Sequence, residues 1–309
     1  MDETGEAVVP PRAIAGFWRR LVAFAIDCIL VGVAGVLLGW FFFDTFARMG
    51  EAARLVGLAI AWPYFGLLNS RLAGGQTAGK WLLGIHVVDR NGAPLDVSES
   101  MLRALVLLTP WLLNGIELSP SRLGFVFGSV LAVIVFGGLG ALVYLYLFNR
   151  RTRQLLHDLV VGSYVVRDEV DITALPTVWK PHLWIVAGLC VAAACLPLGI
   201  LPLLQRQPFA GLMPAYQAVA ALPGVQSAGV QRGFHKVMGG DRTDWVTVTV
   251  RRKVPRVDDQ DFAQQVAQLV MDKYPASREQ DQLFVVLTYG YNIGIASSWR
   301  THQFNFPMR

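Results

Sequence analysis

The sequence predicts an α-helical polytopic membrane protein with five transmembrane helices, followed by a small two-layer α+β soluble domain. Composition is the first observation: 54% of the 309 residues are hydrophobic and 16% are charged, whereas soluble domains carry about 25% charged residues. The second observation is that the apolar residues gather in five blocks. The third is the change after residue 204 to a more polar sequence with alternating and amphipathic patterns.

Charge and cysteine content exclude several protein classes. The net charge is +5, but the basic residues lie between the apolar blocks without forming a dense tract, which favours membrane ends over nucleic acid as their partner. The cysteines, Cys28, Cys190 and Cys195, lie inside apolar blocks, and the five histidines lack metal-ligand spacing. We therefore expect neither a disulfide framework nor a bound metal or cofactor.

The apolar blocks are the predicted spans, at residues 21–43, 52–70, 104–116, 123–148 and 183–204. A helix that crosses a hydrocarbon core of ~30 Å needs about 20 residues, so the first, fourth and fifth blocks are long enough. The third block is short, and a helix lying on the membrane surface would have a similar pattern. The first block is too long for a cleaved signal peptide and is expected to remain as an anchor.

The distribution of basic residues favours five crossings. With all five blocks in the membrane, twelve Lys and Arg residues lie on the side of the N-terminus and four lie in the short segments opposite. Cytoplasmic loops are enriched in Lys and Arg, so residues 1–20 are expected in the cytoplasm and residues 205–309 outside it. Residues 21–167 would form the membrane domain, with 183–204 as the fifth helix, in a bacterial cytoplasmic (inner) membrane.

Residues 205–309 have the pattern of a small α+β domain. We expect a helix at 212–222, strands at 225–237 and 245–252, a helix at 258–274 capped by Asp258, and strands at 283–289 and 293–304. The order helix–strand–strand occurs twice, which suggests a weak internal duplication. The aromatic residues Tyr289, Tyr291 and Trp299 either pack in the core, the more frequent case, or contact a partner.

The segment GGQTAGK at residues 74–80 fits the start of a phosphate-binding loop. Trp81, however, stands where such a loop needs a hydroxyl group for Mg²⁺. We therefore interpret the glycines as a turn where the chain leaves the membrane, with Lys80 facing lipid phosphates. Arg19 and His157 are further candidates for the membrane interface.

A small hairpin is expected directly after this turn. Residues 83–89 and 95–97 have strand-like composition, and the Asn91-Gly92 pair between them is typical of a two-residue hairpin turn.

Asp27 is the only acidic residue within the five predicted spans. It follows Arg20 by seven residues, so the two lie within about 20° on one helix face and about 10 Å apart along the axis. A buried carboxylate costs at least ~2.5–3.5 kcal/mol on insertion scales. Asp27 is therefore either a functional ion-coupling site or a structural hydrogen-bonding or ion-pairing residue, and the sequence leaves both open.

Three ordered motifs within about residues 12–167 resemble those of RDD-domain membrane proteins. The opening motif is AGFWRRL at 15–21 followed by Ala23 and Ile26-Asp27; the middle motif is GQTAGK at 75–80 followed by 83–85 and 87–89; the closing motif is LHDL at 156–159 followed by Gly162 and Val165-Val166. The family name refers to one Arg and two Asp. By position the resemblance assigns these to Arg20, Asp27 and Asp158, with Arg19 as an alternative for the first.

Two functions are compatible with these features. The resemblance implies a family in which a few members look like cation/proton antiporters, so the first hypothesis is a transporter or transport subunit that couples cation and proton movement through Asp27. The alternative is a membrane-anchored binding or assembly protein that presents its extracytoplasmic domain to partners. We expect no enzyme, because the sequence has no nucleophile, metal or cofactor constellation. The expected partners are the lipid bilayer and either a second copy or other membrane proteins, but no nucleic acid.

Overall fold

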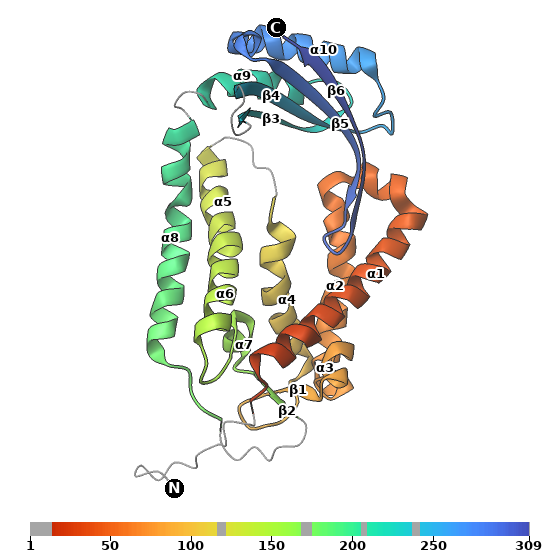
Figure 1. Ribbon diagram of the computed structural model, residues 1–309. Coiled ribbons are helices and arrows are strands. Elements are labelled where there is room, and N and C mark those ends of the chain that lie inside the picture. The colour runs from red at the N-terminus through yellow and green to blue at the C-terminus, as the bar shows by residue number, and fades with distance from the viewer. Residues whose placement is uncertain (1–13, 116–121, 168–174, 205–208, 237–241, 309) are drawn as a thin grey trace. The chain divides into compact units, whose positions relative to one another are not determined.

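The computed structural model describes residues 14–115, 122–167, 175–204, 209–236 and 242–308 (Figure 1). The chain divides into two compact units, one made of Met1–Val36 with Arg54–Leu198 and the other of Leu37–Ala53 with Gly199–Arg309. Most of the predicted N-terminal segment and the first residues of the predicted C-terminal domain lie outside the described residues. The coarse prediction is confirmed: a helical N-terminal region precedes a mixed β-sheet domain.

The first unit is mainly helical. Its helices are α1 (Phe17–Met49, which continues into the second unit), α2 (Arg54–Leu68), α3 (Ala78–Leu82), α4 (Val97–Leu113), α5 (Arg122–Ala132), α6 (Gly138–Phe148), α7 (Leu156–Val161) and α8 (Lys180–Leu204, whose last residues lie in the second unit). A π-helical turn, Val133–Gly137, joins α5 to α6, and short 3-10 turns lie at Gly50–Ala53 and Arg71–Ala73.

Three stretches are long and apolar enough to cross a membrane: Phe17–Leu68, Val126–Phe148 and Lys180–Ile200. The first stretch contains both α1 and α2. Helix α2 has 15 residues and α4 has 17, which at 1.5 Å per residue gives about 22 and 25 Å, less than the ~30 Å hydrocarbon core. The predicted spans at 52–70 and 104–116 therefore coincide with helices that are individually short.

Helix α4 begins earlier than its apolar block. The Glu99 side chain accepts a hydrogen bond from the backbone N–H of Asp96 (3.3 Å) and so caps the helix start at Val97. Helix α4 therefore contains Arg103, which the sequence analysis placed just outside the span.

The first unit also contains a two-stranded sheet, and its pairing differs from the predicted hairpin. Strand β1 (Ile85–Val88) pairs antiparallel with β2 (Tyr164–Arg167), not with residues 95–97. Asn91-Gly92 does form a turn, in which the Asp89 carboxylate accepts hydrogen bonds from the backbone N–H groups of Asn91 and Ala93. Leu95 is buried in the apolar cluster beside the sheet, and its carbonyl oxygen accepts a hydrogen bond from the backbone N–H of Arg71 (2.8 Å).

The second unit is built on a four-stranded sheet in the order β3-β4-β5-β6. The strands are β3 (Val225–Lys236), β4 (Arg242–Arg252), β5 (Gln282–Asn292) and β6 (Ser297–Pro307). The β3–β4 and β5–β6 pairs are antiparallel, and the central β4–β5 pair is parallel. Helix α9 (Phe209–Ala220) precedes β3, and α10 (Gln260–Lys273) with a short 3-10 turn (Pro275–Glu279) connects β4 to β5.

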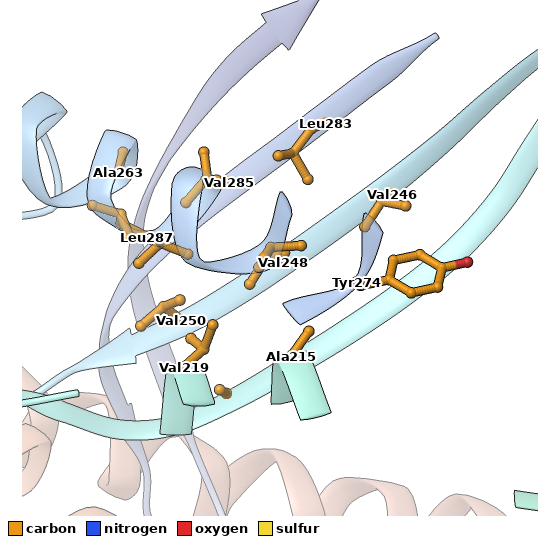
Figure 2. Close-up of a cluster of buried hydrophobic side chains, with 14 of the residues drawn as sticks. Ala215, Val219, Val246, Val248, Val250, Ala263, Tyr274, Leu283, Val285 and Leu287 are labelled. Atoms are coloured by element: carbon orange, nitrogen blue, oxygen red, sulfur yellow. The ribbon is translucent and has the colours of Figure 1, made fainter. Parts of the chain in front are cut away.

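Both helices of the second unit cover one face of the sheet (Figures 1 and 2). Every second residue of β4 and β5 points into this core, where the side chains meet Ala215 and Val219 of α9 and Ala263 of α10; the strand residues are Val246, Val248, Val250, Leu283, Val285 and Leu287. Each fully buried Val or Leu contributes roughly 1.5–3 kcal/mol. The predicted two-layer arrangement and the repeated helix–strand–strand order are both present, although Asp259, not Asp258, caps α10.

The second half of α1 belongs to the second unit because the end of the β5–β6 hairpin packs on it. Tyr289 donates a hydrogen bond to the Asp44 carboxylate (3.0 Å), and the Tyr291 ring lies edge-on to Phe43 and Phe46. Tyr289 and Tyr291 are therefore core residues, with 1% and 2% of their surface exposed. Trp299, the third aromatic candidate for a partner contact, is 42% exposed.

Candidate functional site

Asp158 lies at the centre of a buried polar cluster in the first unit. Its carboxylate accepts hydrogen bonds from Arg20 Nη2 of α1 (2.7 Å) and from Arg103 Nε and Nη2 of α4 (2.9 and 2.6 Å). Because Asp158 stands in the first turn of α7, it also accepts from the backbone N–H of Leu155 (3.1 Å), and Ser163 Oγ lies at 3.3 Å. One carboxylate thus joins three helices that are far apart in sequence.

Electrostatics keep this carboxylate ionised. Burial by itself would raise the pKa of Asp158, but the positive charges of Arg103 and Arg20 outweigh burial and hold the pKa well below its ordinary value of 3.8. Arg20 also donates to the backbone carbonyl of Arg153. Two guanidinium groups around one carboxylate leave the cluster with an excess of positive charge.

Asp27 occupies a second buried polar site, formed by α1, α2 and the start of α3. Its Oδ1 accepts from Tyr64 Oη (2.7 Å) and from the backbone N–H of Gly79 (2.8 Å), and its Oδ2 accepts from Thr77 Oγ1 (2.5 Å). The residue is 1% exposed. Arg20, which shares a face of α1 with Asp27, makes its ion pair with Asp158 instead. Asp27 therefore attaches α1 to α2 and to the loop that starts α3.

The glycines of the GGQTAGK segment permit close backbone approaches. A Cβ atom on Gly79 would overlap the carbonyl oxygen of Ala23 in α1, and a Cβ on Gly75, whose φ is +76°, would overlap the carbonyl oxygen of Val87 in β1. The chain does turn here, as predicted. The glycines also bring the backbone against α1 and β1, which is what places Thr77 and the Gly79 N–H on Asp27.

Lys80 and Arg19, two predicted interfacial residues, have different surroundings. Arg19 is exposed and reaches the carbonyl oxygen of Leu83 (3.5 Å). Lys80 is partly buried and donates to Asn69 Oδ1 (2.6 Å). Burial, followed by repulsion from Arg103, lowers the pKa of Lys80 to about 7. Between the two neighbouring arginines, Arg20 is the buried one that binds Asp158; its assignment as the family arginine stays a prediction.

His157, the third predicted interfacial residue, is buried beside Asp158. Its Nε2 lies 3.5 Å from Asp158 Oδ1, while its Nδ1 has no hydrogen-bond partner among the described residues. Burial lowers the pKa of His157 to about 3 and outweighs the attraction of the Asp158 charge. His157 is therefore neutral at pH 7.

Arg103 is the member of the cluster that the sequence analysis did not select. It makes two of the side-chain hydrogen bonds to Asp158 and is 4% exposed. The available signal was the Asp96–Glu99 capping pair, which moves the helix start upstream and places Arg103 inside the helix, directly before its apolar run. A basic residue in such a position is a site candidate by default.

A cavity of about 290 Å³ borders this cluster within the first unit. Cationic side chains, a histidine and an amide form its polar part, namely Arg20, Lys80, Arg103, His157 and Asn69. The rest of its lining is aliphatic or aromatic.

The two buried acids of the first unit are bound by donors of the protein itself. Within the described ranges, no group of three or more His, Cys, Asp or Glu residues is close enough to hold a metal ion. Asp27 and Asp158 are each engaged by several protein donors. The cluster is suited to joining helices and to presenting positive charge to the cavity.

Comparison with known proteins agrees with the three sequence motifs. The model of the RDD family matches residues 14–162. Among curated proteins, the chain is 29% identical over 152 residues to the uncharacterized protein YckC of Bacillus subtilis (strain 168), a match that covers 49% of this chain and 83% of that protein. No solved structure matches significantly. The fold of the C-terminal domain therefore rests on the present structure.

Proposed function

Because residues 14–162 form an RDD family domain, we propose that this protein is a multi-pass membrane anchor whose C-terminal α+β domain assembles with partner proteins outside the cytoplasm. The observation that carries the proposal is the state of the buried acids. Asp27 is held by three protein donors and Asp158 by two arginines, so both act as structural ties between helices. The proposal assigns the protein no catalytic reaction.

Cation–proton exchange at Asp27 is the competing hypothesis. It would require the carboxyl group to give up its bonds to Tyr64, Thr77 and Gly79 and to replace them with bonds to a cation. A carboxyl group whose oxygens already accept three hydrogen bonds from the protein has fewer lone pairs left to coordinate a cation.

The proposed topology has five crossings, a cytoplasmic N-terminus and an extracytoplasmic C-terminal domain. Helices α2 and α4 coincide with the two shorter apolar blocks, which supports membrane placement of both. The twelve-to-four distribution of basic residues supports the direction.

Strand β6 is the surface through which we expect the C-terminal domain to act. It pairs with β5 along Ser297–Pro307, and among the described strands no other lies against its second edge. Most of its side chains are exposed. An edge strand of this length offers unpaired N–H and C=O groups to a strand of another protein.

Site-specific photo-crosslinking in intact membranes tests the proposal. A photoreactive amino acid at Thr301, exposed on β6, is compared with one at Gln265, exposed on α10 of the same unit. Assembly predicts a discrete adduct from position 301 and none from position 265. The absence of an adduct at 301, or equal diffuse adducts at both positions, would contradict it.

A flux measurement on purified protein in proteoliposomes is the second test of the proposal. The assembly function predicts no cation-dependent proton flux from this protein alone. Flux that is lost in Asp27→Asn, with the variant still folded, would replace the proposal with the transport hypothesis.

A further inference from the structure

The lining of the cavity beside the polar cluster consists of an apolar part and a cationic part. Most of its apolar part comes from four helices, and Ile85 of β1, Val165 of β2 and Leu155 complete it; the helix residues are Leu21 and Phe24 of α1, Phe65 of α2, Leu107 of α4, and Leu142, Val143, Tyr146 and Leu147 of α6. Its polar part holds three cationic side chains, Arg20, Lys80 and Arg103, and no acidic side chain from the described residues. A ligand that fits both parts must be amphiphilic and anionic.

The cavity borders the outer surface of two candidate membrane spans. Leu21 and Phe24 of α1 and Val143 and Leu147 of α6 line the cavity and are also 38%, 42%, 59% and 48% exposed. Surfaces of this kind on spanning helices face acyl chains. The cavity is therefore accessible to a molecule that is already in the bilayer.

The cationic groups are turned toward the cavity with their charges incompletely balanced. Arg20 and Arg103 share the single carboxylate of Asp158, and Lys80 is bound to the neutral amide oxygen of Asn69. A phosphodiester placed here would accept hydrogen bonds from groups whose charge is unscreened by water, and such contacts are about twice as strong as neutral ones.

His157 adds a further polar group. The imidazole lines the cavity, and its Nδ1 is buried without a hydrogen-bond partner among the described residues. With Nε2 directed to the Asp158 carboxylate, the neutral ring presents Nδ1 as an acceptor. A phosphodiester oxygen cannot satisfy an acceptor, whereas a hydroxyl on the headgroup can.

From these contacts we propose that the cavity binds one anionic phospholipid with a hydroxyl-bearing headgroup, of the phosphatidylglycerol type. The phosphate lies against Arg20, Lys80 and Arg103, a headgroup hydroxyl donates to His157, and an acyl chain follows the apolar wall between α1 and α6. The site lies wholly within the first unit and is independent of the assembly function proposed for the C-terminal domain.

Lipid addition to the purified full-length chain tests the site. Dioleoyl phosphatidylglycerol or dioleoyl phosphatidylcholine is added to delipidated protein in neutral detergent, and both the thermal midpoint and the lipid stoichiometry by native mass spectrometry are measured. A bound ligand stabilises the folded state. We expect one retained phosphatidylglycerol and a higher midpoint than with phosphatidylcholine. Equal midpoints with the two lipids would overturn the proposal.

Soluble glycerophosphoglycerol distinguishes a lipid from a free anion. It carries the same phosphodiester and headgroup hydroxyls without acyl chains, so the proposal predicts no shift of the midpoint at the lipid concentrations used. A shift equal to that of phosphatidylglycerol would assign the site to a soluble anion and refute the lipid.

Matched tryptophan substitutions locate the effect. Val143→Trp and Leu147→Trp place an indole at exposed positions that line the cavity, whereas Val130→Trp and Leu198→Trp place it at similarly exposed positions that do not. The first pair is expected to lose the phosphatidylglycerol shift and the second pair to keep it. Retention of the shift by folded variants of the first pair would exclude this cavity.

Lys80→Gln tests the cationic part of the cavity, because the Gln amide can still donate a hydrogen bond to Asn69 Oδ1 but carries no charge. The variant is expected to bind phosphatidylglycerol with less preference over phosphatidylcholine. In the wild type the preference should fall as the pH rises through about 7, because Lys80 loses its charge there. The pKa of His157, about 3, and that of Asp158, well below 3.8, lie far from this range; the other charged groups around Lys80 are Arg20, Arg103 and Asp27. Lys80→Gln should show no such dependence; a similar dependence in the variant would contradict the role of Lys80.

Discussion

His157 and Asp158 are adjacent in sequence and share one buried site, yet burial leaves them in different charge states. Two arginines compensate the charge of Asp158, so it stays ionised. The imidazole of His157 gains too little from Asp158 to offset burial beside the same arginines, so it stays neutral. This difference gives the two residues separate effects on the pH dependence of stability.

His157 is predicted to reduce stability as the pH falls below 6.5. The unfolded chain binds a proton near pH 6.5 while the folded site resists protonation down to about pH 3, so the unfolded state gains protons and stability falls with pH. The contribution of Asp158 is present above its unfolded pKa of about 3.8 and is lost only below it. Thermal midpoints measured between pH 7 and 5 should therefore decline less in His157→Gln than in the wild type. If the midpoints of the two proteins decline equally, His157 takes up its proton at the same pH in the folded protein as in the unfolded chain.

Asp27 is predicted to tolerate Asn and not Leu. The Asn amide oxygen can keep the bonds from Tyr64 and Gly79, and the Thr77 hydroxyl can turn to accept from the amide nitrogen. Leu leaves a buried N–H and two hydroxyls without an acceptor, at about 1–3 kcal/mol for each unsatisfied group. Expression yield and thermal midpoint in detergent measure the difference. A severe loss with Asn would mean that the negative charge itself is required.

The individual residues of the site were only partly predictable from the sequence. Arg20, Asp27 and Asp158 were selected because charged residues near apolar segments and the three motifs marked them. Their pairing was not: helix periodicity places Arg20 near Asp27, but the arginine reaches Asp158, 138 residues later. Such partners are fixed by tertiary packing, which single-helix geometry does not contain.

Among the elements, the GGQTAGK segment offers a matched pair of glycines. Gly74 and Gly75 both have positive φ (+63° and +76°), but a Cβ on Gly75 would overlap the Val87 carbonyl whereas one on Gly74 meets nothing within 4 Å. Gly74→Ala should cost about 1 kcal/mol of backbone strain. Gly75→Ala should cost more, because β1 must move.

The thermal midpoints of these two variants provide the measurement. The proposal of a close backbone approach expects a clearly lower midpoint for Gly75→Ala than for Gly74→Ala. Equal losses would show that backbone conformation alone explains both glycines.

The strands show why one sheet was predictable and the other was not. In β4 the alternation of Trp245-Val246-Thr247-Val248-Thr249-Val250 identifies a strand with one buried face, and the structure buries Val246, Val248 and Val250. In β1 the local signal was the Asn91-Gly92 turn, which predicted a neighbour in sequence. The true partner, β2, pairs Val88 with Tyr164, and no local pattern encodes that distance.

The end of the β5–β6 hairpin contacts residues 37–53, which lie far from it in sequence but belong to the same unit. The core between α9, α10 and the sheet lies within residues 209–308, whereas Tyr289 and Tyr291 pack on residues 37–53. A fragment of residues 208–309 is therefore predicted to melt cooperatively, independent of reductant, while amides near residues 289–297 exchange faster than in the full chain. Hydrogen exchange of both forms measures this; a broad melt would show that the segment 37–53 is required for folding.

At the scale of the whole molecule, the basic-residue distribution predicts a cytoplasmic segment after β2 and an extracytoplasmic C-terminus. A reporter that is active only outside the cytoplasm should be active when fused after Arg309 and silent when fused after Asp168. The reverse pattern would contradict the proposed topology.

The shared carboxylate of Asp158 has a consequence for biosynthesis. Ribosomes release about 5–20 residues per second, and Asp158 is made 138 residues after Arg20 and 55 residues after Arg103. Asp158, whose carboxylate neutralises both arginines, is therefore synthesised about 7–28 s after Arg20 and about 3–11 s after Arg103. Once Arg103 has been made, the nascent helices carry two uncompensated guanidinium groups, which favours keeping these groups at the membrane surface until α7 has been translated.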